Sequence, residues 1–550
     1  MLNPSAGQSI AVHPTQQVGW RKGLGNLPSS WLLGPSVLVA LAMLLPVAYL
    51  ILRSVGASES AWDLLFRLRT LSTLGRTALL GISVTGISIL LAVPLAWLTT
   101  RTDLPFRRFW GVVSVLPLVI PSYVGAFLVV SALGPRGLVQ QILETPFGVD
   151  RLPSIYGFPG ATITLAFLTY PYILLTVRGA IQNLDPSLEE AARGLGHGRW
   201  QTFWRVVVPQ LRPAIAAGSL LVGLYALSDF GAVSLLRYET FTWSIYQQYQ
   251  TAFDRSIAAL LSLVLVALAT VILLMESWSR GRLKYFRTGS GVARRQRVLR
   301  LERWKWPAVA FCAAVAALSL ALPFSVLAYW LVRGVIAGEP LFALWTETRN
   351  SFYASGITAA IAAAFALPFS VLLVRYPGRL SRLLESTSYV GYALPGIVIA
   401  LALVFFGANY ARPVYQTVWL LVFAYLILHF PVALGAIRAA VLQISPRLEE
   451  AARGLGLSRQ RAMLKVTIPL LWPGVLAGAA LVFLVTMKEL PATLILGPLG
   501  FKTLATAIWS ASSEAFFARA AAAALLLILL SSLPTAFLLV RLRSQGDRQP

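Results

Sequence analysis

The chain has 550 residues, of which 57% are hydrophobic and only 12% charged, and its mean hydropathy is +0.72. This composition excludes an ordinary soluble protein and predicts an integral membrane protein, whose length counts membrane spans rather than domains. Lys and Arg outnumber Asp and Glu by 46 to 21, a net charge of +25. Because these charges lie mainly in short loops between apolar runs, they indicate membrane topology rather than nucleic-acid binding.

Twelve apolar runs along the chain are long enough to cross a membrane as helices. We expect spans at residues 31–52, 77–100, 109–133, 158–180, 213–236, 257–276, 307–332, 351–374, 387–408, 414–437, 473–496 and 520–540. Lys and Arg collect after the second, sixth, eighth and twelfth of these runs. Since short cytoplasmic loops carry the positive excess, both termini are predicted to be cytoplasmic.

Cysteine and histidine are scarce. Cys312 is the single cysteine, which excludes an intrachain disulfide and a cysteine-based metal site. The three histidines, His13, His197 and His429, are too scattered for a histidine-rich site. We therefore expect this chain to bind no metal or other cofactor of its own.

A charged segment, LEEAARGLG, occurs twice in this apolar chain, at residues 188–196 and 448–456. Around it, 15 of 28 residues are identical between Pro186–Pro213 and Pro446–Pro473, at a constant offset of 260 residues. AVPLAWLTTR at Ala92–Arg101 also matches ALPFSVLLVR at Ala366–Arg375, and LPLVIP at residue 116 is echoed by LPGIVI at residue 394. The repeat predicts a duplicated module.

The duplication divides the chain. We expect an N-terminal tail (1–30), a first six-helix module (31–279) with a loop at 183–210, a basic linker (280–306), a second six-helix module (307–541) with a loop at 443–470, and a C-terminal tail (542–550). An even number of spans makes the two modules parallel. Both loops are expected in the cytoplasm, although a duplication of purely structural meaning remains an alternative.

Each repeated loop is predicted to begin as a helix, because Asp185 or Ser445 places a capping side chain before a proline. Leu188, Ala191, Ala192 and Leu195 then form one apolar stripe, and the second copy repeats it. On another face, Glu189 and Arg193 are expected to form an i, i+4 pair. Glycines permit a sharp break before a second basic helix, which is predicted to end at Pro209 or Pro469. The loop could act as a lever docked in a partner or lie on lipid headgroups.

Each loop contains Glu-Ala-Ala-x-x-x-Gly and, after nine further residues, two hydrophobic residues separated by one position and followed by a proline, as in Val206-x-Val208-Pro209. This spacing resembles the Glu-Ala-Ala loop of binding-protein-dependent ABC importer permeases. Both copies depart from that pattern only in the hydrophobic pair, usually Ile and Leu. The resemblance implies a type I ABC importer permease fold in the bacterial inner membrane. It also implies that both loops couple to two copies of an ATP-binding subunit, through Glu189, Glu190, Ala191, Ala192, Gly194, Gly196, Glu449, Glu450, Ala451, Ala452, Gly454 and Gly456.

The chain itself is not expected to be an enzyme. It contains no phosphate-binding Gly-x-x-x-x-Gly-Lys-Ser/Thr motif, and GPLGFKT at residue 497 is only a near match on the expected outer side. No cluster of Ser, His and Asp indicates a hydrolase. ATP and Mg²⁺ would be used by separate partner subunits.

Three ionisable residues lie inside expected spans, where charge is costly and is a functional candidate by default. Asp229 and the pair Lys488–Glu489 occupy equivalent points of the repeat. They are candidates for the translocation path, and a structural ion pair between the modules is the alternative.

The same segments, SDFGAV and KELPATL, together with LPLVIPSYVGAF at residue 116, resemble fused ferric-iron permeases. That resemblance implies an extracytoplasmic ferric-binding protein as the donor of the solute. Permeases for thiamine, polyamines, phosphonates or sulfate remain alternatives. A gradient-driven transporter with helices kinked at prolines is a further alternative, but it would not need duplicated coupling loops.

Overall fold

The computed structural model describes residues 29–56, 62–135, 137–148, 152–184, 186–251, 256–279, 298–340 and 343–546. Within these ranges all regular secondary structure is helical, apart from one isolated bridge between Thr102 and Leu299. The expected N-terminal tail, the cap at Asp185 and most of the basic linker lie outside the described residues. The predicted all-α membrane fold is confirmed.

The first half of the chain contains fifteen described helical elements. They are α1 (Ser30–Val55), η1 (Leu64–Phe66), α3 (Leu68–Arg101), α4 (Arg107–Val113), η2 (Leu116–Val119), α5 (Ser122–Leu133), α6 (Leu138–Phe147), α7 (Phe158–Gln182), α8 (Pro186–Gly194), α9 (Arg199–Thr202), η3 (Phe203–Val207), α10 (Val208–Ser228), α11 (Gly231–Leu235), α12 (Phe241–Thr251) and α13 (Ser256–Ser279).

The second half repeats this order. Its described elements are η4 (Glu302–Trp304), α14 (Lys305–Ala316), η5 (Ala317–Ala321), α15 (Leu322–Ile336), α16 (Trp345–Arg375), α17 (Arg379–Ser388), α18 (Val390–Ala393), α19 (Gly396–Tyr410), η6 (Arg412–Val414), α20 (Val418–Gln443), α21 (Pro446–Gly454), α22 (Arg459–Ala462), η7 (Met463–Thr467), α23 (Ile468–Met487), α24 (Pro491–Leu496), α25 (Leu504–Ser513) and α26 (Phe517–Gly546).

Ten helical stretches in the described chain are long and apolar enough to cross a membrane, and the first part of α26 is a shorter apolar helix where the twelfth span is predicted. The predicted ninth span, 387–408, is wrong as one helix, because it is interrupted around Leu394 and Pro395 and only α19 continues from Gly396. The predicted span at 109–133 is wrong as one helix. It is interrupted at Pro117 and Pro121, and the long apolar stretch runs instead from Ser122 to Glu144. A proline lacks the N–H that a continuing helix would need.

Three other prolines are absorbed without a break. Widened π-helical turns, η3, η7 and η5, end two residues before Pro209, Pro469 and Pro323. Such a turn relieves the clash between the proline ring and the preceding carbonyls. The prediction that a separate basic helix ends at Pro209 or Pro469 is therefore wrong, because α9, η3 and α10 form one continuous helix, as do α22, η7 and α23.

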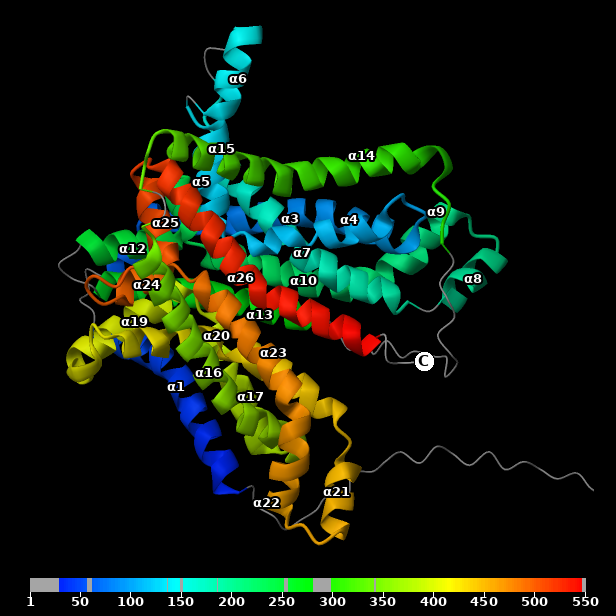
Figure 1. Cartoon of the computed structure of the whole chain (residues 1–550), viewed down its shortest axis with the longest axis vertical. Coiled ribbons are helices and arrows are strands. Elements are labelled where there is room, and N and C mark those ends of the chain that lie inside the picture. The colour runs from blue at the N-terminus through cyan, green and yellow to red at the C-terminus, as the bar shows by residue number, and fades with distance from the viewer. Residues whose placement is uncertain are drawn as a thin grey trace, which may run out of the picture.

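The structure also corrects the alignment of the two modules. Helices α5 and α19 both start directly after a proline in extended conformation, Pro121 and Pro395. These prolines are 274 residues apart, the same offset as Arg101 and Arg375. The sequence echo between residues 116 and 394 is therefore out of register. After α5 the offset falls to 260 because the first module contains the extra helix α6, which projects from the body of the protein (Figure 1).

The first helix of each module packs on the other module. Helix α1 contacts α16, α17 and α19, while α14 and η5 contact α3 and α7. Ala308 and Cys312 of α14 are buried in the core of the first module. The two bundles converge around α12, α24 and α25, and they diverge toward α8 and α21 (Figure 1). The modules are therefore interlocked rather than merely joined.

Close packing of α10 on α7 depends on Gly218. A Cβ atom at this position would lie 2.7 Å from the Cα atom of Ile173. We expect Gly218→Ala to lower the free energy of unfolding by about 1–3 kcal/mol, because the backbones would have to separate. Thermal unfolding of the detergent-solubilised protein measures this change. Gly223→Ala on the same helix is the matched control, since its nearest neighbour would be Thr85 Oγ1 at 3.6 Å. Equal melting temperatures for the two variants would contradict the packing argument.

Candidate functional site

The first repeated loop (residues 183–210) is held to the protein by a long-range ion pair. Arg101, at the end of α3, donates to Oε1 of Glu189 on α8, and both side chains are largely buried. The predicted local pair of Glu189 with Arg193 is therefore wrong, because the buried guanidinium group of Arg101 takes the carboxylate. Removing one partner of a buried pair leaves an uncompensated charge and costs about 3–5 kcal/mol.

The second repeated loop (residues 443–470) is anchored in the same way. Arg375, at the end of α16, lies 3.3 Å from Oε1 of Glu449, and its guanidinium group also donates to the carbonyl of Ile444 at 3.1 Å. Thr467 donates to Glu449 at 2.9 Å. Arg101 and Arg375 are the last residues of the matching segments Ala92–Arg101 and Ala366–Arg375. This match was the sequence signal from which the anchoring arginines could have been found.

The elbow of each loop is a helix C-cap. Gly196 has a φ of 87° and Gly456 a φ of 90°, in the left-handed region that favours glycine. The amides of Gly196 and His197 donate to the carbonyls of Arg193 and Ala192, which is the Schellman pattern. The second loop has the same two hydrogen bonds. Gly194 and Gly454, also predicted to permit the break, instead end their helices without a positive φ.

The apolar stripe of each loop faces outward. Ala192 and Ala452 are buried, but Leu195 is 82% and Leu455 87% exposed, and Leu188 and Leu448 are nearly half exposed. Ala191, Glu190, Ala451 and Glu450 are exposed as well. Each loop thus pairs an inward carboxylate with an outward apolar surface, which is the arrangement of a docking element rather than of a core helix.

The candidate translocation residues lie at helix breaks. Helix α10 ends at Ser228, and the carboxylate of Asp229 accepts hydrogen bonds from the amides of Ala232 and Val233 at 2.9 and 3.3 Å. Helix α23 ends at Met487, and Glu489 accepts from the amide of Ala492 at 3.3 Å. The predicted continuous spans at 213–236 and 473–496 are therefore wrong, because at each break a carboxylate replaces the lost backbone acceptors.

The two breaks have equivalent neighbours. Ser122, the first residue of α5, lies beside Asp229. Its counterpart Gly396, the first residue of α19, would place a Cβ atom 2.7 Å from Oε1 of Glu489. Tyr225 of α10 lies within electrostatic range of both carboxylates. The structure therefore brings the predicted acidic residues to related places near the contact between the modules.

Lys488 does not form the structural ion pair that is the alternative to a place in the translocation path. Its Nζ atom donates to the carbonyl of Leu118 in η2 of the first module at 3.1 Å, and it has no carboxylate partner within 4.0 Å among the described residues. Instead, Glu489 Oε2 lies 3.9 Å from Nε2 of the buried His429. Sequence reasoning set His429 aside, although a histidine in the apolar span of α20 was itself a signal.

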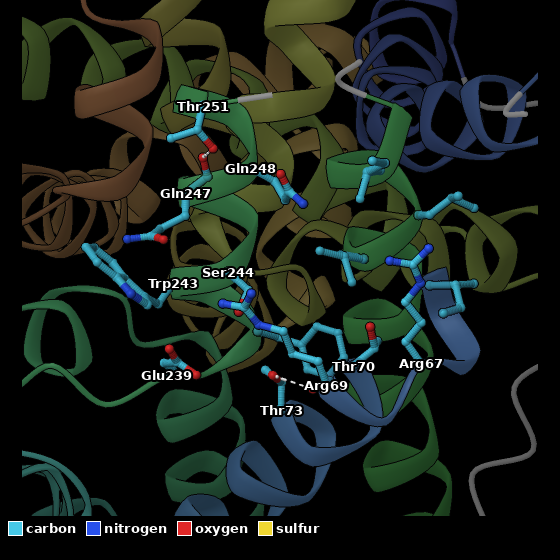
Figure 2. A pocket seen from close by; sticks show the side chains of 15 residues that line it. Arg67, Arg69, Thr70, Thr73, Glu239, Trp243, Ser244, Gln247, Gln248 and Thr251 are labelled. Carbon is cyan, nitrogen blue, oxygen red and sulfur yellow. Dashed lines mark hydrogen bonds between the residues drawn. The ribbon is translucent and has the colours of Figure 1, made fainter. Parts of the chain in front are cut away.

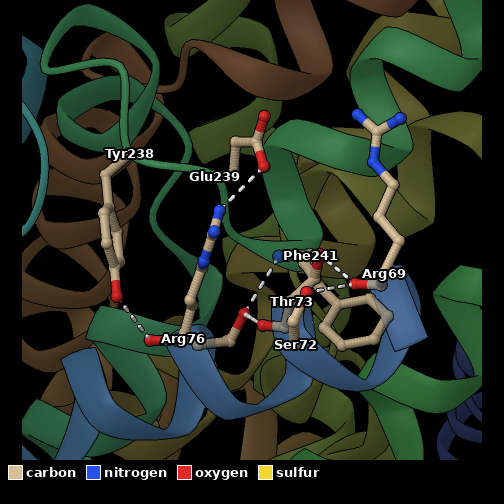
Figure 3. A network of polar contacts seen from close by, with 8 residues as sticks. Arg69, Ser72, Thr73, Arg76, Tyr238, Glu239 and Phe241 are labelled. Carbon is tan, nitrogen blue, oxygen red and sulfur yellow. Dashed lines mark hydrogen bonds and ion pairs between the residues drawn. The ribbon is translucent and has the colours of Figure 1, made fainter.

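At the end of the protein opposite the repeated loops, a network ties the segment after α11 to α3 (Figure 3). Arg76 and Glu239 form an ion pair at 2.9 Å, and the Tyr238 hydroxyl donates to the carbonyl of Arg76 at 3.1 Å. The amide of Phe241 donates to Oγ1 of Thr77 at 3.1 Å. This network fixes the chain that follows the break at Asp229.

Beside this network lies a cavity of about 370 Å³ between α3 and α12. Figure 2 shows Arg67 and Arg69 on one side of it and Gln247 and Gln248 on the other. Because Glu239 is paired with Arg76, the lining carries a positive charge that attracts anionic groups. No group of three or more potential metal ligands is found in the described part of the chain.

Two segments of the chain, 87–285 and 356–543, match the family described as binding-protein-dependent transport system inner membrane component. The chain belongs to this family. It is thus a multi-pass inner-membrane permease of an ABC importer, a class that works with an ATPase and an extracytoplasmic binding protein.

Among individual relatives, the Fe(3+)-transport system permease protein FbpB 2 of Haemophilus influenzae is 37% identical over 93% of this chain and 98% of its own length. The putative ferric transport system permease protein FbpB 1 of the same organism is 26% identical over 74% of this chain and 68% of its own. The molybdenum transport system permease protein ModB of Escherichia coli is 32% identical over 37% of this chain and 92% of its own length.

The elbow geometry predicts different outcomes for neighbouring glycines. In Gly196→Ala the alanine would have to adopt the left-handed backbone conformation, which costs about 1–2 kcal/mol. Because this weakens the cap, we expect faster hydrogen exchange at the amides of residues 196 and 197. Gly194→Ala is the matched control, because alanine stabilises a helix by about 1 kcal/mol relative to glycine. Hydrogen–deuterium exchange mass spectrometry distinguishes them, and slower or equal exchange in Gly196→Ala would show that the elbow does not need glycine.

Proposed function

We propose that this permease imports ferric iron delivered by an extracytoplasmic ferric-binding protein, driven by ATP hydrolysis in two copies of a separate ATP-binding subunit. The observation that carries the mechanism is the repeated loop. Each copy is exposed on its apolar face, anchored on its acidic face, and continuous with a helix that ends at a carboxylate-bearing break.

The loops supply the coupling. Glu189, Glu190, Ala191, Ala192, Gly194 and Gly196, with their counterparts Glu449, Glu450, Ala451, Ala452, Gly454 and Gly456, form the two docking elements. ATP and Mg²⁺ would bind to the partner subunits, and both termini would lie on their side of the membrane. The largely buried Arg–Glu pairs fix both helices with their leucines exposed, and two like helices held in this way suit two like protein partners.

The lever is the continuous helix after each elbow. Residues 199–228 span about 45 Å at 1.5 Å per residue, from the loop to the break at Asp229. Residues 459–487 make the same connection to Lys488 and Glu489. A displacement of the loop by the ATPase therefore moves the helix end that carries the acidic residue.

Asp229, Glu489 and Lys488 are proposed to shape the translocation path. Carboxylates in a low-dielectric interior favour a cation, and the two acidic groups lie at equivalent breaks near the module contact. Ferric iron is supported by the relatives named for ferric transport, which match across both modules, whereas the molybdenum permease matches about a third of the chain. The family assignment favours ATP-driven transport over the gradient-driven alternative.

The docking proposal predicts that Leu195→Arg combined with Leu455→Arg releases the ATP-binding subunits. Burial of a leucine side chain contributes about 1.5–3 kcal/mol, so affinity should fall about tenfold or more for each loop. Co-purification of the two subunits from membranes measures the loss. Leu499→Arg is the control, since this leucine is 90% exposed between α24 and α25, away from the loops. Undiminished co-purification of the double variant would refute the docking surface.

The substrate proposal predicts ATP-dependent uptake of ⁵⁵Fe³⁺ into proteoliposomes that contain the permease, its ATPase and a ferric-loaded binding protein. Glu489→Gln should slow this uptake about tenfold, because one carboxylate charge is lost from the buried path. Glu514→Gln, at an exposed position after α25, is the control. Uptake of sulfate, molybdate or thiamine in place of iron would overturn the substrate while leaving the importer class intact.

A further inference from the structure

The described end of the segment that joins the modules is fixed to the same residues that hold the first repeated loop. The amide of Leu299 donates to the carbonyl of Arg101 at 2.8 Å, and the amide of Asp103 donates to the carbonyl of Leu299 at 3.0 Å. These bonds form the parallel bridge between Thr102 and Leu299. Arg101 thus faces the repeated loop with its side chain and the joining segment with its backbone.

The carboxylate of Asp103 completes this attachment. One oxygen accepts from the amide of Leu301 at 2.8 Å, and the other lies 2.9 Å from Nζ of Lys305, the first residue of α14. Both partners stabilise the ionised form, so the Leu301 amide and then Lys305 hold the pKa of Asp103 below its ordinary value. We call the contacts of residues 101–103 with Leu299, Leu301 and Lys305 the linker clamp.

The second module has no equivalent of this clamp in its sequence. At the offset of 274 residues that relates Arg101 to Arg375, Asp103 corresponds to Pro377. A proline offers neither the amide that donates to Leu299 nor the carboxylate that accepts from Leu301. The two repeated loops, although identical over nine residues, are therefore connected differently to the rest of the protein.

Through the clamp, the first repeated loop reaches a helix of the other module. Helix α14 begins at Lys305 and packs on α3, with Ala308 and Cys312 buried in the core of the first module. Movement of α8 is thus passed to Arg101 and from there to α14, in addition to α10. In the described chain, the second loop reaches α23 and α16 through Thr467 and Arg375, without a corresponding contact to a joining segment.

We propose that Asp103 is a positioning residue for transport, which couples the first repeated loop to α14 and thereby makes the two loops functionally unequal. This inference rests on the proposed function, because it assumes that the ATP-binding subunits act on the loops. Asp103 does not touch the solute. Asp103 makes α14 move together with α8 when the first module moves.

The test compares transport with ATP hydrolysis in the complete complex, reconstituted in proteoliposomes with its ATPase and its loaded binding protein. Asp103→Ala is expected to lower the number of ions imported per ATP at least about threefold, while the ATP-binding subunits still co-purify. Asp103→Asn keeps an oxygen acceptor for the Leu301 amide but loses the charge that faces Lys305, so its ratio should lie between those of wild type and Asp103→Ala. Glu302→Gln removes a neighbouring charge that lies outside the clamp, and its ratio should equal that of wild type.

A covalent rescue separates positioning from general stability. In a Cys312→Ser background, Thr102→Cys and Leu299→Cys place one thiol on each partner of the parallel bridge, so that oxidation can cross-link them. Oxidation of this pair in the Asp103→Ala protein should restore the ratio of transport to hydrolysis, and reduction should abolish it again. Should Asp103→Ala weaken assembly, the oxidised protein still provides the comparison.

The outcomes distinguish the clamp from the function on which it rests. A wild-type ratio in Asp103→Ala, or no recovery after oxidation, would overturn the clamp while the importer still worked. Failure of the wild-type complex to couple hydrolysis to import would instead refute the proposed function. Matched single variants add a further check, since Leu195→Arg should impair transport more than Leu455→Arg, and equal losses would contradict the inequality of the loops.

Discussion

The lipid interior offers no partner for a free backbone amide or carbonyl, and the helix breaks at Asp229 and Glu489 meet that constraint with side-chain acceptors. Before Pro209 and Pro469, widened turns redirect the carbonyls that the proline leaves without a partner. Where the helix stops altogether, a carboxylate takes over as acceptor, at Asp229 and at Glu489. The acidic groups proposed for the translocation path are therefore also the groups that make a break in the membrane possible.

Two largely buried Arg–Glu pairs hold the repeated loops against the helical bundle at the surface that partners can reach. Arg101 and Arg375 fix Glu189 and Glu449, and the fixed helices present Leu195 and Leu455 outward. Because the helix after each elbow is unbroken, a movement of the elbow reaches the break through a single helix. The exchange of first helices, α1 onto the second module and α14 onto the first, joins the two modules by packing on both sides.

Much of the candidate site can be predicted from the sequence, and the predictions that are wrong or incomplete share one cause. The repeat located both loops, and Gly196 and Gly456 were rightly placed at the elbows. Local spacing predicts a partner for Glu189 four residues away, whereas its partner in the structure, Arg101, lies 88 residues earlier in the chain. His429 was set aside for the same reason, because its proximity to Glu489 exists only after α20 and α23 have packed.

By itself the sequence determined the membrane class, the duplication and the positions of the repeated loops, because apolar run length and repeated spacing are properties of the chain alone. Tertiary structure decided which residues meet. It set the true register of the modules through Pro121 and Pro395, exchanged the first helices, and placed Asp103 against Lys305 across the junction of the modules. These contacts join residues far apart in the chain, so they depend on how the helices pack and not on any local pattern.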